Sequence, residues 1–111
     1  MPRDYKVYLE DILESARRIR AYTSAMSLKE LAHDTKTLDA VVRNLEIVGE
    51  AAKNIPEAIR AQRPQVEWKR IAGLRDILIH EYFGVDTEIV WDIIKNKLPP
   101  LEKEVAELLV K

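Results

Sequence analysis

The sequence predicts an all-α protein, an up-down bundle of four to five helices that forms a single domain over residues 1–111. Three observations predict this class. Apolar residues recur at intervals of three and four along most of the chain, which is the period of an amphipathic helix. Glycine occurs only three times, and few segments alternate apolar with polar residues as strands do. Hydrophobic residues make up 47% of the chain, enough to build one core.

The first half of the chain predicts three helices. An apolar stripe that begins at Tyr5 predicts a helix from about residue 4 to 24. Ser27 is followed three residues later by Glu30, which is a capping-box pattern and predicts a short helix that ends near residue 33. A second long stripe of apolar residues predicts the third helix, from about residue 37 to 54.

Prolines and glycines divide the middle of the chain. Pro56 ends the long helix, because proline has no amide hydrogen to donate within a helix. It can also open a helical turn, which predicts a short helix over about 57–62. After a second break at Pro64, apolar spacing predicts a helix over about 66–82, which Gly73 bends or interrupts.

The last predicted helix follows Gly84, a typical residue just past a helix end. Asp86 or Thr87 caps its start, because short polar side chains satisfy the first backbone amides of a helix. The pair Pro99-Pro100 lies inside the apolar run of this helix. We therefore expect a kink or a break at that pair.

Composition limits the possible functions. The chain has no cysteine, which excludes a disulfide framework and thiol catalysis. No apolar run approaches the length of a membrane span, and the charged N-terminus lacks a signal-peptide core, so we expect a cytoplasmic protein with no membrane contact. The net charge of −1 excludes gross attraction to nucleic acid, so a nucleic-acid site would be a local basic patch.

Charge changes sign abruptly along the second half of the chain. Residues 53–75 carry six basic and two acidic side chains, whereas residues 76–92 carry five acidic side chains and no lysine or arginine. The basic segment is a candidate approach surface for a polyanion, although a charge run is also typical of a solvated face. Both interpretations stay open from the sequence.

The segment at this charge boundary, residues 75–82, gathers the side chains best suited to chemistry. Arg75 supplies a planar cation that binds phosphate, and His80 can move protons near neutral pH. Asp76 lies at i, i+4 from His80 and can orient its imidazole from the same helix face. The segment also contains the phenol of Tyr82.

Together these groups suggest chemistry on a phosphodiester, and RNA cleavage without a metal ion is the case to consider. A base removes the 2′-hydroxyl proton, the oxygen attacks the adjacent phosphorus, and an acid protonates the leaving 5′-oxygen. His80 would be the base or the acid, and Arg75 would neutralise the charge that develops on the phosphoryl oxygens. The reaction needs neither a metal ion nor a cofactor.

Helical geometry leaves the arrangement of these groups open. Arg75 and His80 are five residues apart, which is about 140° around a regular helix, whereas Arg75 and Tyr82 nearly share a face. Either the helix distorts, or Arg75 reaches round, or the pair forms across a two-fold homodimer. A homodimer would also supply a second His80, so that base and acid lie on opposite sides of the phosphorus. The plainer interpretation is an exposed Arg75 beside an ordinary Asp76–His80 surface pair.

A second polar group lies on the long central helix. Arg43, Glu46 and Glu50 fall on one stripe of this helix, and Asn44 lies in the same segment. This stripe is either a solvent face or a surface that lines a dimer groove or docks a partner. The sequence favours neither interpretation.

The motif Arg75-x4-His80-x-Tyr82, with Asp76 directly after the arginine, also resembles the signature of the HEPN superfamily, and more narrowly of HepT-like proteins. Residues 43–51 resemble the central-helix segment of that family, and residues 68–86 resemble its hallmark run. The resemblance covers most of the chain and has no departure at the motif positions.

The resemblance implies an all-α homodimer that acts as a metal-independent endoribonuclease toxin of a toxin–antitoxin pair. By position, Arg75 and His80 would be catalytic, and Asp76 would be the polar residue that follows the arginine. Tyr82 would accept AMP from a cognate minimal nucleotidyltransferase, the antitoxin. The alternative that this resemblance leaves open is a non-catalytic helical module that binds a nucleotidyltransferase or a nucleotide substrate.

Overall fold

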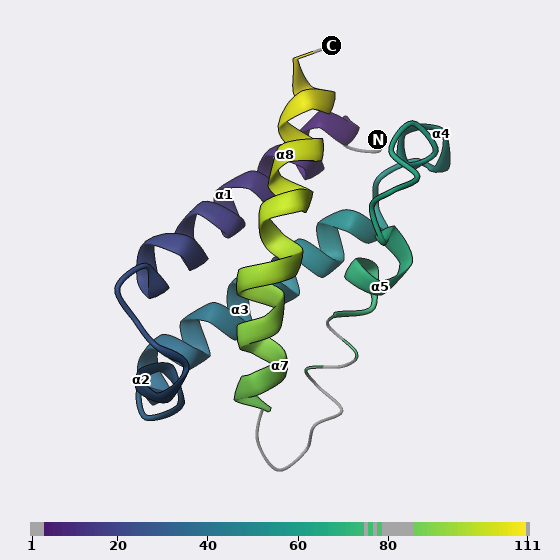
Figure 1. The fold of residues 1–111 in the computed structure, drawn as a ribbon. Helices are drawn as coiled ribbons and strands as arrows, with labels where there is room; N and C mark the ends of the chain where they lie inside the picture. Colours follow the sequence, from purple (N-terminus) through teal and green to yellow (C-terminus); the bar gives the residue numbers. More distant parts are fainter. Residues whose placement is uncertain (1–3, 75, 77, 79–85, 111) are drawn as a thin grey trace.

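The structure, a computed structural model, describes residues 4–74, 76, 78 and 86–110 (Figure 1). Every regular element within these ranges is a helix, which confirms the all-α class, while the two-fold assembly stays a prediction. The elements in chain order are α1 (Tyr5–Thr23), α2 (Leu28–Ala32), α3 (Thr35–Lys53), α4 (Glu57–Arg60), α5 (Trp68–Ala72), α7 (Thr87–Asp92), the π-helical turn η1 (Ile93–Lys97) and α8 (Leu98–Leu109). No helix of the described residues is both long and apolar enough to cross a membrane.

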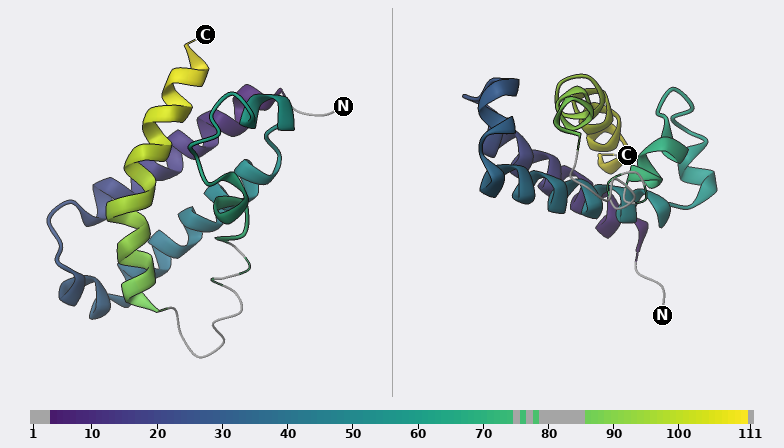
Figure 2. Two further views of the ribbon diagram at one scale, coloured as in Figure 1. Left: turned by 45° about the vertical axis from the view of Figure 1, so that its right-hand side comes forward. Right: turned by 90° about the horizontal axis from the view of Figure 1, so that it is seen from below.

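The helices form two layers. The long helices α1 and α3 pack side by side along most of their length. The consecutive elements α7, η1 and α8 form one helical rod that lies across this pair, as the two views of Figure 2 show. In this arrangement α8 packs on α1, and α7 contacts α2. The short helix α5 packs against α3 beside the rod, so the chain that leads into residues 75–82 begins next to the layer boundary.

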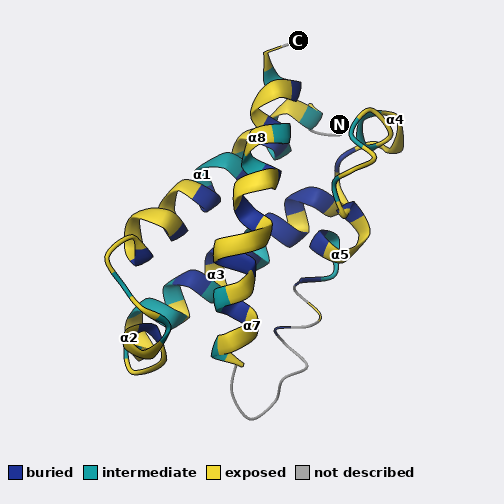
Figure 3. Ribbon diagram, in the orientation of Figure 1, coloured by how far each residue is buried: buried dark blue, intermediate teal, exposed yellow. Residues whose placement is uncertain are grey.

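The core lies between the two layers, and each long helix turns its buried face towards it (Figure 3). The apolar stripes predicted from spacing supply this core, because residues three and four apart share one helix face. The bulky apolar side chains that are almost wholly buried are Leu9, Ile12, Ile19, Leu31, Val41, Leu45, Val48, Ile55, Val90 and Val105. Both layers contribute to this list, so the layers form one continuous core.

Side-chain hydrogen bonds to backbone amides mark where helices α2 and α3 begin. The Ser27 hydroxyl accepts a bond from the Glu30 amide at 3.1 Å, and the Glu30 carboxylate accepts one from the Ser27 amide at 3.0 Å. The predicted capping box is therefore confirmed. Helix α3 begins at Thr35, two residues before the predicted start at Thr37, because Asp34 caps it. The Asp34 carboxylate accepts bonds from the Thr37 amide at 3.0 Å and from the Thr37 hydroxyl at 2.8 Å.

The sequence predicts a later end for α4 and an earlier start for α5 than the structure has. Helix α4 ends at Arg60 rather than near residue 62. Helix α5 begins at Trp68, because Val66 belongs to a turn in which its amide donates to the Arg63 carbonyl. Gly73 ends α5 as predicted, and helical conformation resumes at Leu74.

The prediction of a kink or break at Pro99-Pro100 is met by a change in helix type rather than by a break. Helical structure runs without interruption from residue 87 to residue 109. The wide turn η1 precedes the prolines, and the Leu98 amide donates to the Ile93 carbonyl five residues earlier. Pro99 and Pro100 then occupy the first turn of α8, directly after this wide turn, so the change of helix type stands where two residues without an amide hydrogen interrupt the regular hydrogen-bond pattern.

Candidate active site

The predicted catalytic segment is only partly described. Arg75, His80 and Tyr82 lie outside the described residues, as does the predicted stop at Gly84. Asp76 is helical and exposed. Its neighbours Leu74 and Leu78 are helical and buried, four residues apart, which places them on one face. The two leucines therefore anchor this stretch to the core, and Asp76 lies on the opposite, solvent-facing side.

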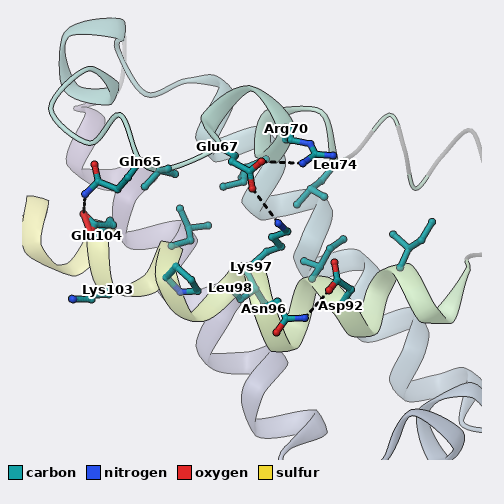
Figure 4. A pocket seen from close by; sticks show the side chains of 16 residues that line it. Gln65, Glu67, Arg70, Leu74, Asp92, Asn96, Lys97, Leu98, Lys103 and Glu104 are labelled. Carbon is teal, nitrogen blue, oxygen red and sulfur yellow. Dashed lines mark hydrogen bonds and ion pairs between the residues drawn. The ribbon is translucent and has the colours of Figure 1, made fainter.

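A groove of about 570 Å³ opens directly beside the start of this segment (Figure 4). It lies between α5 on one wall and α7, η1 and α8 on the other. The groove is lined by Gln65, Val66, Glu67, Arg70, Ile71, Leu74, Ile89, Asp92, Ile93, Asn96, Lys97, Leu98, Pro100, Leu101, Lys103 and Glu104. Leu74 is the last described residue before Arg75, so the groove reaches the point in the chain where the predicted catalytic segment begins.

The groove has an apolar floor. Ile71 and Leu74 contribute from the α5 side, and the rod contributes Ile93, Leu98 and Leu101. These five side chains belong to the core cluster, and each keeps only a small exposed fraction. The floor is therefore rigid packing surface of the two layers, because its side chains are held from behind by the core.

Charged side chains stand at the groove's edge, around Glu67. Arg70 Nη1 donates to one Glu67 carboxylate oxygen at 2.9 Å, and Lys97 Nζ donates to the other at 3.2 Å. Figure 4 shows Glu67 between these two cations, one from α5 and one from the rod. The hydrogen bond from Arg70, followed by that from Lys97 and its charge, holds the pKa of the Glu67 carboxyl below its ordinary value. Glu67 is thus a carboxylate shared by two cations.

A second polar cluster closes the other end of the groove. Glu104 of α8 accepts a hydrogen bond from Gln65 Nε2 at 2.9 Å and lies 3.1 Å from Arg63 Nε. Arg63 also reaches Glu107 at 3.6 Å. The Arg63 carbonyl accepts a bond from the indole nitrogen of Trp68 at 3.0 Å. These contacts fasten the segment before α5 to α8 and so fix the width of the groove.

No sequence pattern indicates this second cluster, because Gln65 and Glu104, which meet in it, are about 40 positions apart along the chain. The cluster also changes the interpretation of the basic segment. Arg60, Arg63 and Arg70 each form an ion pair with a glutamate. Glu57 and Glu67 belong to this segment, whereas Glu104 comes from α8, so the surface around residues 53–75 is less basic than the composition of the segment indicates.

The polar stripe of α3 divides between surface and interior. Arg43 and Glu50 are exposed, and Glu46 is partly buried. Asn44 is buried, and its side-chain amide donates to the Ala40 carbonyl at 2.9 Å. Of the four residues predicted as a possible partner face, Asn44 thus turns inward and supports the helix itself.

The sequence of the chain matches known proteins along nearly its whole length. A family model described as "Ribonuclease HepT-like" matches residues 12–108. "Putative RNase MJ0127" of Methanocaldococcus jannaschii is 48% identical over 110 residues, which cover 98% of this chain and 91% of that protein. "Probable ribonuclease HepT" of Thermococcus cleftensis is 42% identical over 108 residues, which cover 97% and 98% of the two chains. No solved structure matches the chain.

Proposed function

This chain belongs to the HepT-like ribonuclease family, and we propose that it is a metal-independent endoribonuclease, the toxin of a toxin–antitoxin pair. The observation that carries the proposal is the motif Arg75-x4-His80-x-Tyr82 in a chain whose relatives carry ribonuclease names. The described residues around the motif support it, because Leu74 and Leu78 are buried while Asp76 is exposed to solvent.

The proposed reaction is transesterification at one RNA phosphodiester. The 2′-oxygen attacks phosphorus, the bond to the 5′-oxygen breaks, and the products carry a 2′,3′-cyclic phosphate and a 5′-hydroxyl. His80 transfers the protons, Arg75 stabilises the charge on the phosphoryl oxygens, and Asp76 orients the imidazole. A second copy of the chain, in a two-fold homodimer, would place a second His80 on the opposite side of the phosphorus.

Tyr82 is the proposed regulatory position. A cognate nucleotidyltransferase would transfer AMP from ATP to the phenol oxygen and release pyrophosphate. The new phosphodiester brings a negative charge and a bulky nucleoside two residues from His80. Both would exclude RNA, the charge by repulsion of the RNA phosphates and the nucleoside by its volume. Mass spectrometry of the Tyr82 peptide after co-expression with such a partner tests this step by looking for added AMP.

The experiment that tests the activity is RNA cleavage in the presence of a metal chelator. Wild-type protein should cut RNA and leave 2′,3′-cyclic phosphate ends, and His80→Ala should cut roughly 10²–10⁴-fold more slowly, the range expected for loss of a positioned acid or base. Arg75→Ala should also lose activity.

The matched control is His33→Ala. His33 is the other histidine of the chain, exposed at the end of α2, with its Nδ1 2.8 Å from the Lys29 carbonyl oxygen. Its removal should leave cleavage unchanged. Circular dichroism checks that each variant folds. If His80→Ala folds and still cuts RNA at the wild-type rate, the proposed mechanism is wrong. A wild type that binds a nucleotidyltransferase but cuts no RNA would identify the non-catalytic module instead.

A further inference from the structure

We propose that the groove between α5 and the α7–η1–α8 rod binds one unpaired nucleotide of the RNA substrate. The base lies on the apolar floor, and the adjoining phosphate binds Arg70 and Lys97 at the edge. This inference rests on the proposed ribonuclease function and assigns a substrate subsite to it. Three features of the groove carry the inference: its position, its shape and its charge.

The position of the groove suits a nucleotide next to the cleaved phosphodiester. Its α5 wall ends at Leu74, and the next residue in the chain is Arg75, the predicted phosphate ligand. Successive nucleotides of one strand are covalently joined, so a strand whose phosphate reaches Arg75 places a neighbouring nucleotide beside this wall. The groove therefore lies next, along the chain, to the first residue of the candidate active site.

The shape of the groove fits a base that has left its stack. A volume of about 570 Å³ falls within the range of roughly 300–1,000 Å³ typical of small-molecule sites. The floor is apolar and held from behind by the core, so it offers a preformed surface to the flat face of a base. Proteins that recognise RNA mostly bind such unpaired bases rather than duplex RNA. The amide nitrogens of Gln65 and Asn96 already donate to Glu104 and Asp92, so it is their carbonyl oxygens that would accept hydrogen bonds from the edge of the base.

The groove lining as a whole carries three basic and three acidic side chains, and the two cations that suit a phosphate gather around Glu67. Arg70 and Lys97 share the single carboxylate of Glu67, so this group of three keeps a net charge of +1. The Arg70 side chain is 76% exposed, and those of Lys97 and Glu67 are each 45% exposed. Such exposed pairs are weak and open to solvent. A phosphodiester can replace Glu67 as the acceptor and gain charge-assisted hydrogen bonds.

Glu67 has a positioning role in this proposal. It holds a cation of α5 and a cation of η1 at the same edge before RNA arrives. It also competes with the phosphate for both cations, because a carboxylate and a phosphodiester accept the same hydrogen bonds. Glu67→Gln should weaken this competition, and we expect the variant to bind RNA more tightly than the parent protein.

The test measures RNA binding separately from cleavage. His80→Ala protein, whose slow cleavage should not disturb a binding measurement, is titrated into a short unstructured RNA with a fluorescent label, and the anisotropy is recorded over a series of salt concentrations. Adding Arg70→Ala and Lys97→Ala should raise the Kd about ten-fold or more, the effect expected when hydrogen bonds between charged groups are removed. In a plot of the logarithm of the binding constant against the logarithm of the salt concentration, the slope should become shallower by about 0.7 for each phosphate that the variant no longer binds.

The matched control removes one arginine and one lysine elsewhere, Arg17→Ala with Lys29→Ala. Arg17 is an exposed cation paired with Glu14 on α1, and Lys29 is exposed on α2, so net charge falls equally in both variants. The control should change the Kd and the slope far less. As a second measurement, photo-crosslinking of RNA that contains 4-thiouridine should label peptides that line the groove.

The outcomes separate this inference from the proposed function. If the wild type cuts RNA but the groove variant binds no worse than the control, the subsite is wrong and the nuclease stands. If the wild type neither binds nor cuts RNA, both fall. If the groove variant changes only the oligomeric state, measured by light scattering, the groove is an interface between copies of the chain and the subsite is again wrong.

Discussion

Glu104 makes a quantitative test of how the groove is held together. Its carboxylate faces Arg63 Nε at 3.1 Å and accepts a hydrogen bond from Gln65 at 2.9 Å, so it ties the segment before α5 to α8. The side chains of Arg63 and Glu104 are only 15% and 14% exposed. Glu104→Ala would leave the Arg63 guanidinium nearly buried, with the Glu107 contact at 3.6 Å as its remaining ion pair and a hydrogen bond from Nη1 to the Gln62 carbonyl at 3.2 Å.

The expected cost follows from this burial. Breaking a fully buried ion pair by removing one partner costs about 3–5 kcal/mol, whereas an exposed pair contributes about 0–1 kcal/mol. At this exposure, the Arg63–Glu104 pair lies nearer the buried limit, and Glu107 compensates part of the loss. We therefore expect Glu104→Ala to lower the free energy of unfolding by about 2–3 kcal/mol. For a chain of this length, that corresponds to a fall in Tm of about 10 °C, at about 4 °C per kcal/mol.

The assay is urea unfolding followed by circular dichroism, with Glu14→Ala as the control. Glu14 pairs with Arg17 and Arg18 on the open surface of α1, so we expect its removal to change stability much less. The double variant Arg63→Ala with Glu104→Ala should be destabilised by less than the sum of the two single variants, because the two residues interact directly. A Glu104→Ala effect below about 0.5 kcal/mol, the range of ordinary surface substitutions, would refute this reasoning.

Three further predictions concern single positions. Ser27→Ala should lower the free energy of unfolding by about 1 kcal/mol in urea titrations, because it removes the acceptor of the capping box. Gly73→Ala should leave thermal stability unchanged or raise the free energy of unfolding by up to about 1 kcal/mol, since its φ is −84° and an added Cβ would meet the nearest atoms at an ordinary 3.5 Å. The free energy of unfolding of the wild type should exceed that of Glu67→Gln above pH 4.5, the ordinary pKa of the carboxyl. This difference should disappear as the pH falls through the lowered folded-state pKa, because only the ionised carboxyl holds Arg70 and Lys97. An equal difference at pH 7 and at pH 3 would contradict it.

Local patterns were enough to place most of the described helices. The Ser27 capping box and the helix end at Gly73 depend on residues within one turn of each other, so their sequence signals are complete. The start of α3 was placed too late because the apolar stripe begins at Leu38, inside the helix. The capping contact of Asp34 with Thr37 decides the start, and it lies before the stripe.

The candidate site divides in the same way. The reactive side chains can be predicted without knowledge of the fold, because the motif that contains them is confined to residues 75–82. The groove beside it could not be predicted, because its walls come from α5 and from a rod that starts more than ten residues later. Which residues of the two walls meet depends on the crossing of the layers, and helical periodicity says only that each wall has an apolar face.

The ion pairing of the basic segment has a consequence for how RNA would be recognised. Arg60 and Arg63 pair with Glu57, Glu104 and Glu107, so they offer little charge to a distant polyanion. With a net charge of −1, the chain also exerts no strong long-range attraction on RNA. Recognition must then depend on short-range contacts, with single phosphates at defined cations and a base in a shaped groove. Such contacts select for unpaired RNA, because only an unstacked base can enter the groove. We therefore expect the protein to cut single-stranded loops faster than duplex RNA of the same sequence, and equal rates on the two would mean that this short-range selection does not operate.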